Sequence, residues 1–125
     1  MKILVVEDNP MNMELAADLL EVAGYEVLQA INAMDGISVA TTQHPDLILM
    51  DLGLPGMNGL EATKILKADP ITIGIPILAL TAHSMPADEA LVIKTGCDGY
   101  ISKPIDTRQF VKTIEKYLPV ERPQK

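Results

Sequence analysis

The sequence predicts an α/β protein built on a doubly wound parallel sheet, and three observations support this fold class. Apolar runs alternate along the chain with segments of helical periodicity, as in repeated β/α units. The first run is continuous and rich in β-branched residues, which is typical of a strand covered on both faces. The 125 residues, 48% of them apolar, suffice for one core. We therefore expect one domain with five β/α units.

The first unit has the clearest boundaries. The strand Ile3–Val6 ends at the acidic pair Glu7-Asp8. Asn9-Pro10 then supplies a capping side chain and a helix-compatible first residue, and Gly24 ends the helix. The apolar residues between them are spaced as on one buried helix face. That face is expected to contain Leu15, Ala16, Leu19, Leu20 and Ala23.

The same alternation predicts the remaining elements. Further strands are expected at residues 26–30, 47–50, 77–80 and 100–101, and further helices at 34–42, 60–68 and 87–95. A loop rich in Gly and Pro covers residues 53–59. Asp106 and Gln109 resemble a capping box at the start of the last helix. Its buried face is expected to contain Phe110, Val111, Ile114, Tyr117 and Leu118. The domain is expected to span residues 1–119, with 120–125 as a tail or linker stub.

Charge and composition exclude several classes of function. The net charge is −7, and residues 1–62 contain ten acids against Lys2 alone. Acidity and an aromatic content of 3% argue against nucleic-acid binding. The first apolar run is too short for a signal peptide or a membrane span, so we expect no membrane association and a cytoplasmic location. The single cysteine, Cys97, is expected to be a small buried hydrophobe.

Polar residues follow four of the five predicted strands. Glu7 and Asp8 follow the first, and Asp51, Thr81 and Lys103 follow the third, fourth and fifth. In open parallel sheets, ligands bind outside the carboxyl ends of the strands. Three carboxylates gathered there would repel one another without a cation, and Mg²⁺ prefers oxygen ligands. These residues therefore predict a magnesium site at Glu7, Asp8 and Asp51.

Four motifs, in this order and spacing, resemble the receiver domains of two-component response regulators. They are the pair Glu7-Asp8, the stretch 51–59 (DLGLPGMNG), the pair Thr81-Ala82 and the stretch 100–104 (YISKP). The opening Glu7-Asp8-Asn9 with Asn12 is similar to receivers of phosphorelays and hybrid kinases. The resemblance covers residues 1 to about 119. It implies the flavodoxin-like receiver fold with the strand order 2-1-3-4-5.

The resemblance implies that Asp51 accepts a phosphoryl group from a histidine kinase or a histidine phosphotransfer protein. Asp8 and Asp51 would bind Mg²⁺ (or Mn²⁺) directly, Glu7 directly or through water, and Gly53 through its backbone carbonyl. The chemistry agrees, because a carboxylate can displace a group at phosphorus when the developing charge is neutralised. The metal, Thr81 and Lys103 would supply that neutralisation.

The resemblance also implies the residues that respond to phosphorylation. Those that bind the phosphoryl group or form the switch are Thr81, Ala82, Tyr100, Lys103 and Pro104, with a cis peptide bond expected between Lys103 and Pro104. Gly53 and His83 occupy positions that adjust the rate of dephosphorylation. The alternative is that Gly53 only makes the loop easier to form and that His83 is a solvated loop histidine.

One helix is predicted to leave apolar surface near solvent. Leu91, Val92 and Ile93 are consecutive, and at about 100° per residue they span roughly 200° of a helix, more than one face can bury. By resemblance, the face formed by Leu91, Val92, Tyr100 and Lys112 would meet a downstream protein. The chain is expected to be a monomer or a weak dimer.

The function expected from the sequence is a stand-alone, phosphorelay-type signalling switch. It would catalyse only its own phosphoryl transfer and slow self-dephosphorylation. A fragment of a longer regulator or hybrid kinase remains an alternative. A phosphohydrolase with an aspartate nucleophile would need a second acid where Gly53 stands, and a flavin mononucleotide binder would be repelled by Glu7-Asp8.

Overall fold

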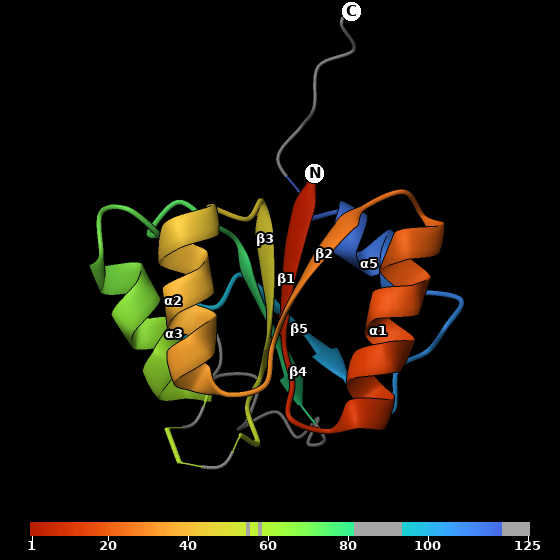
Figure 1. The fold of residues 1–125 in the computed structure, drawn as a ribbon, viewed down its shortest axis with the longest axis horizontal. Coiled ribbons are helices and arrows are strands. Elements are labelled where there is room, and N and C mark those ends of the chain that lie inside the picture. The colour runs from red at the N-terminus through yellow and green to blue at the C-terminus, as the bar shows by residue number, and fades with distance from the viewer. Residues whose placement is uncertain (55, 58, 82–93, 119–125) are drawn as a thin grey trace, which may run out of the picture.

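The computed structural model describes residues 1–54, 56–57, 59–81 and 94–118. Five parallel strands form one sheet in the order β2-β1-β3-β4-β5 (Figure 1). The strands are β1 (Lys2–Val6), β2 (Glu26–Ala30), β3 (Leu47–Asp51), β4 (Ile77–Thr81) and β5 (Gly99–Ser102). The chain passes from β1 outward to β2 and then returns to β3, so the strand order reverses between β1 and β3. The predicted fold class and strand order are confirmed.

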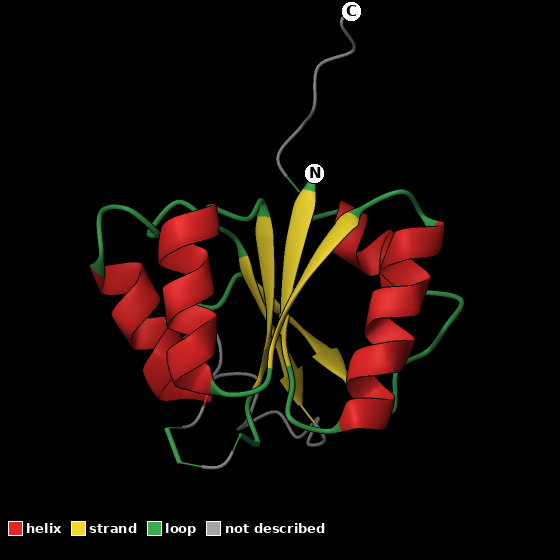
Figure 2. Cartoon of the chain, in the orientation of Figure 1, coloured by secondary structure: helices red, strands yellow, loops and turns green. Residues whose placement is uncertain are grey.

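Helices cover both faces of the sheet. They are α1 (Pro10–Val22), α2 (Ala33–Gln43), α3 (Gly59–Ala68) and α5 (Phe110–Glu115). Figure 2 shows α1 and α5 on one side and α2 and α3 on the other. The helix predicted at 87–95 lies, except for its last two residues, outside the described residues. None of the described helices has both the length and the apolar character that a bilayer crossing requires.

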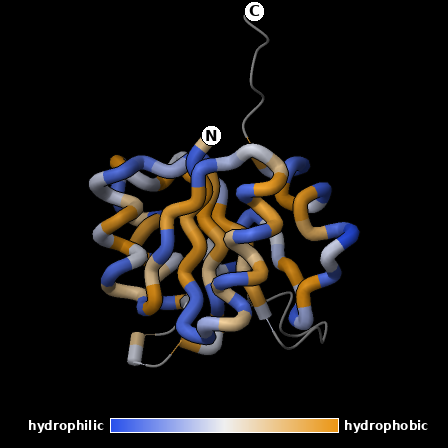
Figure 3. The backbone as a smooth tube through the Cα atoms, turned by 45° about the vertical axis from the view of Figure 1, so that its right-hand side comes forward, coloured by the Kyte–Doolittle hydropathy of each residue, from blue (hydrophilic) through white to orange (hydrophobic). Residues whose placement is uncertain are grey.

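The core consists of two aliphatic clusters separated by the sheet. Every residue of β3 and β4 is buried, and Figure 3 shows hydrophobic residues concentrated along the central strands. Alternate residues of β1 face opposite sides. Leu4 and Val6 join the cluster under α2 and α3, whereas Ile3 and Val5 join the cluster under α1 and α5. Apolar residues cover both faces of the central strands, so functional groups are confined to the strand ends.

The first helix begins and ends where the sequence indicates. Oδ1 of Asn9 accepts hydrogen bonds from the N–H groups of Met11 (2.9 Å) and Asn12 (3.1 Å). Pro10 is the first helical residue, and Gly24 follows the helix with a φ of 97°, which favours glycine. The predicted N-cap and the terminating glycine are confirmed.

The buried face of α1 differs from the predicted face. The buried residues are Met13, Ala16, Ala17 and Leu20, which follow the helical period closely. Leu15 is 36% exposed, because it lies two residues, or about 200°, around the helix from Met13. Ala23, which caps the end of the helix, is exposed as well. The predicted placement of Leu15 and Ala23 on the buried face is therefore wrong.

The predicted capping box at the last helix is also wrong, because α5 begins at Phe110. Oδ1 of Asp106 accepts a hydrogen bond from the N–H of Arg108 (3.0 Å), and Gln109 makes no side-chain capping bond. The carbonyl of Asp106 accepts bonds from the N–H groups of Gln109 and Phe110, which closes a turn before the helix. Tyr117, predicted to lie on the helix, follows its end and still packs against the α1 and α5 cluster.

The single cysteine is buried, as predicted. Cys97 is 5% exposed and belongs to the cluster under α2 and α3. Its Sγ donates a hydrogen bond to Oγ1 of Thr63 at 3.8 Å. Burial raises the pKa of the thiol, which keeps the group protonated.

We predict that Gly36→Ala lowers the free energy of unfolding by about 1–3 kcal/mol, because α2 packs on β1 at this residue. A Cβ atom at Gly36 would lie 2.8 Å from Cγ2 of Val6. Urea denaturation measures the change. The matched control is Gly74→Ala, where an added Cβ meets no atom within 4 Å, and its change should stay within about 0.5 kcal/mol. Equal losses of stability in the two variants would contradict this packing argument.

Candidate functional site

Three carboxylates meet at the carboxyl edge of the sheet. Glu7 and Asp8 follow β1, and Asp51 is the last residue of β3. Val6 is the register partner of Met50, so Glu7, directly after β1, lies level with Asp51 of the neighbouring strand. One carboxylate oxygen from each of Glu7, Asp8 and Asp51 lies within 4.8 Å of the others. The structure therefore brings together the acids that the sequence predicts.

Lys103 reaches these acids from the opposite side of the edge. Its Nζ lies 2.9 Å from Oε1 of Glu7 and 3.1 Å from Oδ2 of Asp51. Its backbone N–H donates to the carbonyl of Thr81 at 2.7 Å, which extends the pairing of β4 with β5. The peptide bond between Lys103 and Pro104 is cis, as predicted. One ammonium group thus contacts two carboxylates from different strands.

Burial is the largest single influence on the pKa values of Glu7 and Lys103. Glu7 is 1% exposed, and its desolvation raises the pKa of its carboxyl group, although the Lys103 ammonium partly offsets the effect. For Lys103 the loss of water lowers the pKa, but hydrogen bonding and attraction to Glu7 and Asp51 outweigh that loss and raise the pKa overall. Lys103 is therefore a cation at neutral pH.

Backbone N–H groups hold the other oxygen of each buried acid. The N–H of Asn9 donates to Oε2 of Glu7 at 3.1 Å, and the N–H of Gly53 donates to Oδ1 of Asp51 at 2.9 Å. Each carboxylate therefore has one oxygen fixed by the loop that follows its strand and one oxygen near Lys103. These contacts set the orientation of both acids.

Gly59 constrains the geometry of the site, although its place in the motif 51–59 alone indicates no such role. A Cβ atom on this residue would overlap the carbonyl oxygen of Asp51 and approach Cα of Leu52 to 3.0 Å. The first residue of α3 is therefore packed directly against the backbone of Asp51, an approach that only glycine permits. The motif 51–59 contained this glycine, but the close approach depends on where α3 lies in space.

The carboxylate cluster fits a divalent cation. Its donors are all oxygens, which suits Mg²⁺ or Mn²⁺, and among the described residues three carboxylates outnumber the one ammonium group that contacts them. Oε1 of Glu7 is buried and lies 2.9 Å from Nζ of Lys103, and a carboxylate oxygen has two lone pairs, so this contact leaves room for a further ligand. The cluster thus retains acceptor capacity for a cation.

The other predicted site residues lie on β4, β5 and α5 or outside the described residues. Thr81 is 6% exposed at the end of β4. Tyr100 is half-buried on β5 and packs against the α2 and α3 cluster. Lys112 is exposed on α5. The predictions for Ala82, His83, Leu91 and Val92 fall on residues outside the described part of the chain.

The fold and site together define a class of protein. The chain matches the response regulator receiver domain family over residues 3–115, and it belongs to this family. The resemblance inferred from the sequence is thereby confirmed. As a receiver domain, the chain takes part in phosphorylation-dependent signalling, and such domains interact with histidine kinases and downstream targets.

Relatives agree with this assignment over nearly the whole chain. The polar-differentiation response regulator DivK of Brucella ovis is 46% identical over 116 residues, which cover 93% of this chain and 94% of that protein. The chemotaxis protein CheY4 of Vibrio cholerae has a TM-score of 0.89 at 28% identity, covering 94% of this chain and 98% of that one. The receiver domain of the sensor histidine kinase PA1611 of Pseudomonas aeruginosa, which has a magnesium ion coordinated in its active site cleft, has a TM-score of 0.85 at 31% identity, covering 93% and 95%.

We predict that Lys103→Met destabilises the protein in a pH-dependent way. Without the ammonium group, ionised Glu7 and Asp51 lose their counter-charge, which should lower the free energy of unfolding by about 2–4 kcal/mol near pH 8. Burial already raises the pKa of Glu7, and the substitution raises it further. As the pH falls through that raised pKa, Glu7 takes up a proton and the penalty of a buried charge disappears. The difference between variant and parent should therefore shrink towards about pH 4.

Urea denaturation of both proteins across this pH range, in the presence of a chelator, measures the difference. Lys64→Met is the matched control, because Lys64 is exposed on α3. A difference between Lys103→Met and the parent that stays constant with pH would contradict the proposed role of the buried charges.

Proposed function

We propose that the chain is a phosphorylation-controlled switch whose Asp51 accepts a phosphoryl group from a histidine kinase or a histidine phosphotransfer protein. The observation that carries the proposal is the position of Asp51, whose carboxylate lies 3.1 Å from Nζ of Lys103 and beside two further carboxylates. An aspartate in that setting can act as a nucleophile, and the ammonium group of Lys103 can stabilise the negative charge of the incoming phosphoryl group.

The reaction is an in-line displacement at phosphorus. A carboxylate oxygen of Asp51 forms a bond to phosphorus, while the bond from phosphorus to the histidine nitrogen breaks and the nitrogen keeps the electron pair. Lys103 remains protonated and donates hydrogen bonds to the phosphoryl oxygens, and the Thr81 hydroxyl donates another. The N–H of Gly53 holds the carboxylate in place during the attack. The product is an acyl phosphate on Asp51.

Mg²⁺ is the proposed cofactor, and Mn²⁺ is an alternative. Asp8 and Asp51 would bind it directly, Glu7 directly or through water, and Gly53 through its backbone carbonyl. When bound, the cation would neutralise the repulsion between the carboxylates and an anionic phosphoryl group. The convergence of the three carboxylates and the magnesium ion of the PA1611 receiver support this assignment.

Thr81 and Tyr100 are the proposed switch residues, and Lys103, Pro104 and Ala82, the last outside the described residues, complete the set proposed to bind the phosphoryl group or form the switch. In this proposal Thr81 moves towards the phosphoryl group and Tyr100 turns inward behind it. Gly53 and His83 would adjust how long the phosphoryl group survives. The acyl phosphate adds charge and acceptor oxygens next to Lys103, which supports a rearrangement of the donors around it.

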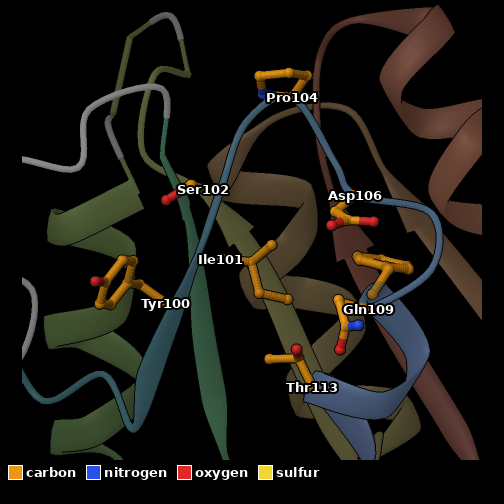
Figure 4. A pocket seen from close by; sticks show the side chains of 8 residues that line it. Tyr100, Ile101, Ser102, Pro104, Asp106, Gln109 and Thr113 are labelled. Carbon is orange, nitrogen blue, oxygen red and sulfur yellow. The ribbon is translucent and has the colours of Figure 1, made fainter.

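The proposed output surface is the β5 and α5 face. A groove of about 420 Å³ lies there, and Figure 4 shows Ile101, Gln109 and Thr113 around it, with Tyr100 on the other side of the strand. Together with Lys112, and with Leu91 and Val92 from outside the described residues, this face would meet a downstream protein. We further propose a cytoplasmic protein that is a monomer or a weak dimer.

Asp51 should be the one residue that is phosphorylated. Incubation with Mg²⁺ and acetyl phosphate should add the mass of one phosphoryl group, and Asp51→Asn should abolish this addition. Excess chelator should abolish it too, because an anionic nucleophile approaching an anionic donor needs a cation between them. Intact mass spectrometry measures both effects.

The matched control for Asp51→Asn is Asp35→Asn, in the first turn of α2. This variant should be labelled to the same extent as the parent. Undiminished labelling of the Asp51→Asn protein, or labelling in chelator, would refute the proposal.

Phosphorylation should change hydrogen exchange at β5 and α5 more than at α2 and α3. The reason is that Lys103, which contacts Asp51, directly follows β5, whereas α2 packs against β1 and β2. Exchange measured with and without an aspartyl-phosphate mimic, beryllofluoride, tests this expectation, and the Asp51→Asn protein with beryllofluoride is the control. Changes restricted to α2 and α3 would contradict the assigned output surface.

A further inference from the structure

The outer edge of β2 carries backbone groups that no described strand uses. β2 is the end strand of the sheet, and its inner side pairs with β1. The N–H of Glu26 donates to Met1 and the carbonyl of Ala30 accepts from Glu7, so these groups point towards β1. Backbone groups alternate in direction along a strand, so those of Val27 and Gln29 point to the outer edge. The edge therefore offers donors and acceptors to a further strand.

A groove of about 440 Å³ lies between this edge and α1. Gln29 and Ile31 line it from the side of β2, and Glu14, Asp18 and Glu21 line it from α1. At its end the groove reaches Glu7 and Asp8 of the phosphoacceptor site. No residue that lines the groove is positively charged.

The acids of α1 form a row along the groove. Glu14, Asp18 and Glu21 are spaced by four and three residues, which places them on one helix face, about 6 and 4.5 Å apart along the axis. All three are exposed. A ligand with regularly spaced positive charges would match this row.

We propose that the groove binds an extended, basic segment of a partner protein, which adds to β2 as a further strand. The outward backbone groups of Val27 and Gln29 would pair with the segment, as in other cases of strand addition to a sheet edge. Residues directly opposite each other on paired strands have their side chains on the same face of the sheet. Because Gln29 lines the groove, the segment residue opposite Gln29 would direct its side chain to the groove as well. Side chains on one face of a strand recur about every 6.6–6.8 Å, and long, flexible lysine or arginine side chains can adjust this repeat to the shorter spacings of about 6 and 4.5 Å between the α1 acids. Lysine or arginine at alternate positions would therefore meet Glu14, Asp18 and Glu21.

Other occupants fit this groove less well. A metal ion needs converging ligands, and within the described residues the one such set is Glu7, Asp8 and Asp51. A second copy pairing through its own β2 would place beside the acidic groove a strand that contains Glu26 and no basic residue, so it would supply no matching positive charge. The inference goes beyond the proposed phosphotransfer and does not depend on Asp51.

The test uses a synthetic peptide that alternates lysine and threonine, acetyl-KTKTKTK-amide, as the probe. Calorimetry at low salt should detect binding, and acetyl-TTTKKKK-amide, with the same composition and charge, should bind about tenfold more weakly because its lysines do not share one face. Nuclear magnetic resonance should show that the amide N–H groups of Val27 and Gln29 become protected from exchange. Equal affinities for the two peptides, or no protection at β2, would overturn the proposal.

Two sets of protein variants separate charge from pairing. The triple variant Glu14→Gln, Asp18→Asn, Glu21→Gln should weaken binding about tenfold, whereas Asp35→Asn, Glu61→Gln, Asp69→Asn removes equal charge away from β2 and the groove and should change it less than about twofold. Equal losses in the two triple variants would overturn the proposal.

Gln29→Pro removes the outward N–H but leaves the pairing with β1, and it should weaken binding, while Gln29→Ala should not. A peptide N-methylated at the residues that face β2 gives the same test without altering the protein. Undiminished binding of that peptide would overturn the pairing. Asp51→Asn protein should bind the parent peptide as the parent protein does, so failure of phosphorylation and failure of this inference are distinguishable.

Discussion

A single ammonium group holds two buried carboxylates together, and the functional edge of the molecule depends on this contact. Glu7 and Asp51 are almost fully buried, a costly position for acids that lack a counter-charge. Lys103 supplies one positive charge, and the N–H groups of Asn9 and Gly53 fix the remaining oxygens. Because Asp8 adds a third carboxylate nearby, the site stays short of positive charge. This excess of negative charge favours the binding of a cation at the site. A phosphoryl group could then approach the carboxylates together with the bound metal ion.

The strand order makes this contact possible. β1 and β3 are neighbours, so the acids that follow or end them stand side by side, whereas β5 lies on the far side of β4. The long side chain of Lys103 therefore crosses the end of β4 to reach Asp51 and Glu7. β4 ends at Thr81, a small residue. Apolar packing on both faces of the sheet leaves this edge as the place where polar groups gather.

The sequence predicted most of the fold and the identity of the acids, because both depend on local patterns. Buried strands appear as continuous apolar runs, and Asn9-Pro10 combines a capping side chain with a residue that suits the first helical position. Features that depend on how elements pack were missed or wrong. Met13 rather than Leu15 is buried because the sheet contacts only a narrow stripe of α1. The approach of Gly59 to Asp51 and the row of acids facing β2 likewise depend on where helices lie.

The burial of Cys97 has a practical consequence for spectroscopy. The chain contains one cysteine, and that thiol is shielded and kept protonated by its surroundings. Thiol-directed reagents react through the thiolate, so they would modify the native protein slowly. A cysteine introduced at an exposed position would thus be labelled selectively without first removing Cys97. Pairs of spin labels on α2 and α5 would then report distances across the sheet in a protein whose core is unaltered.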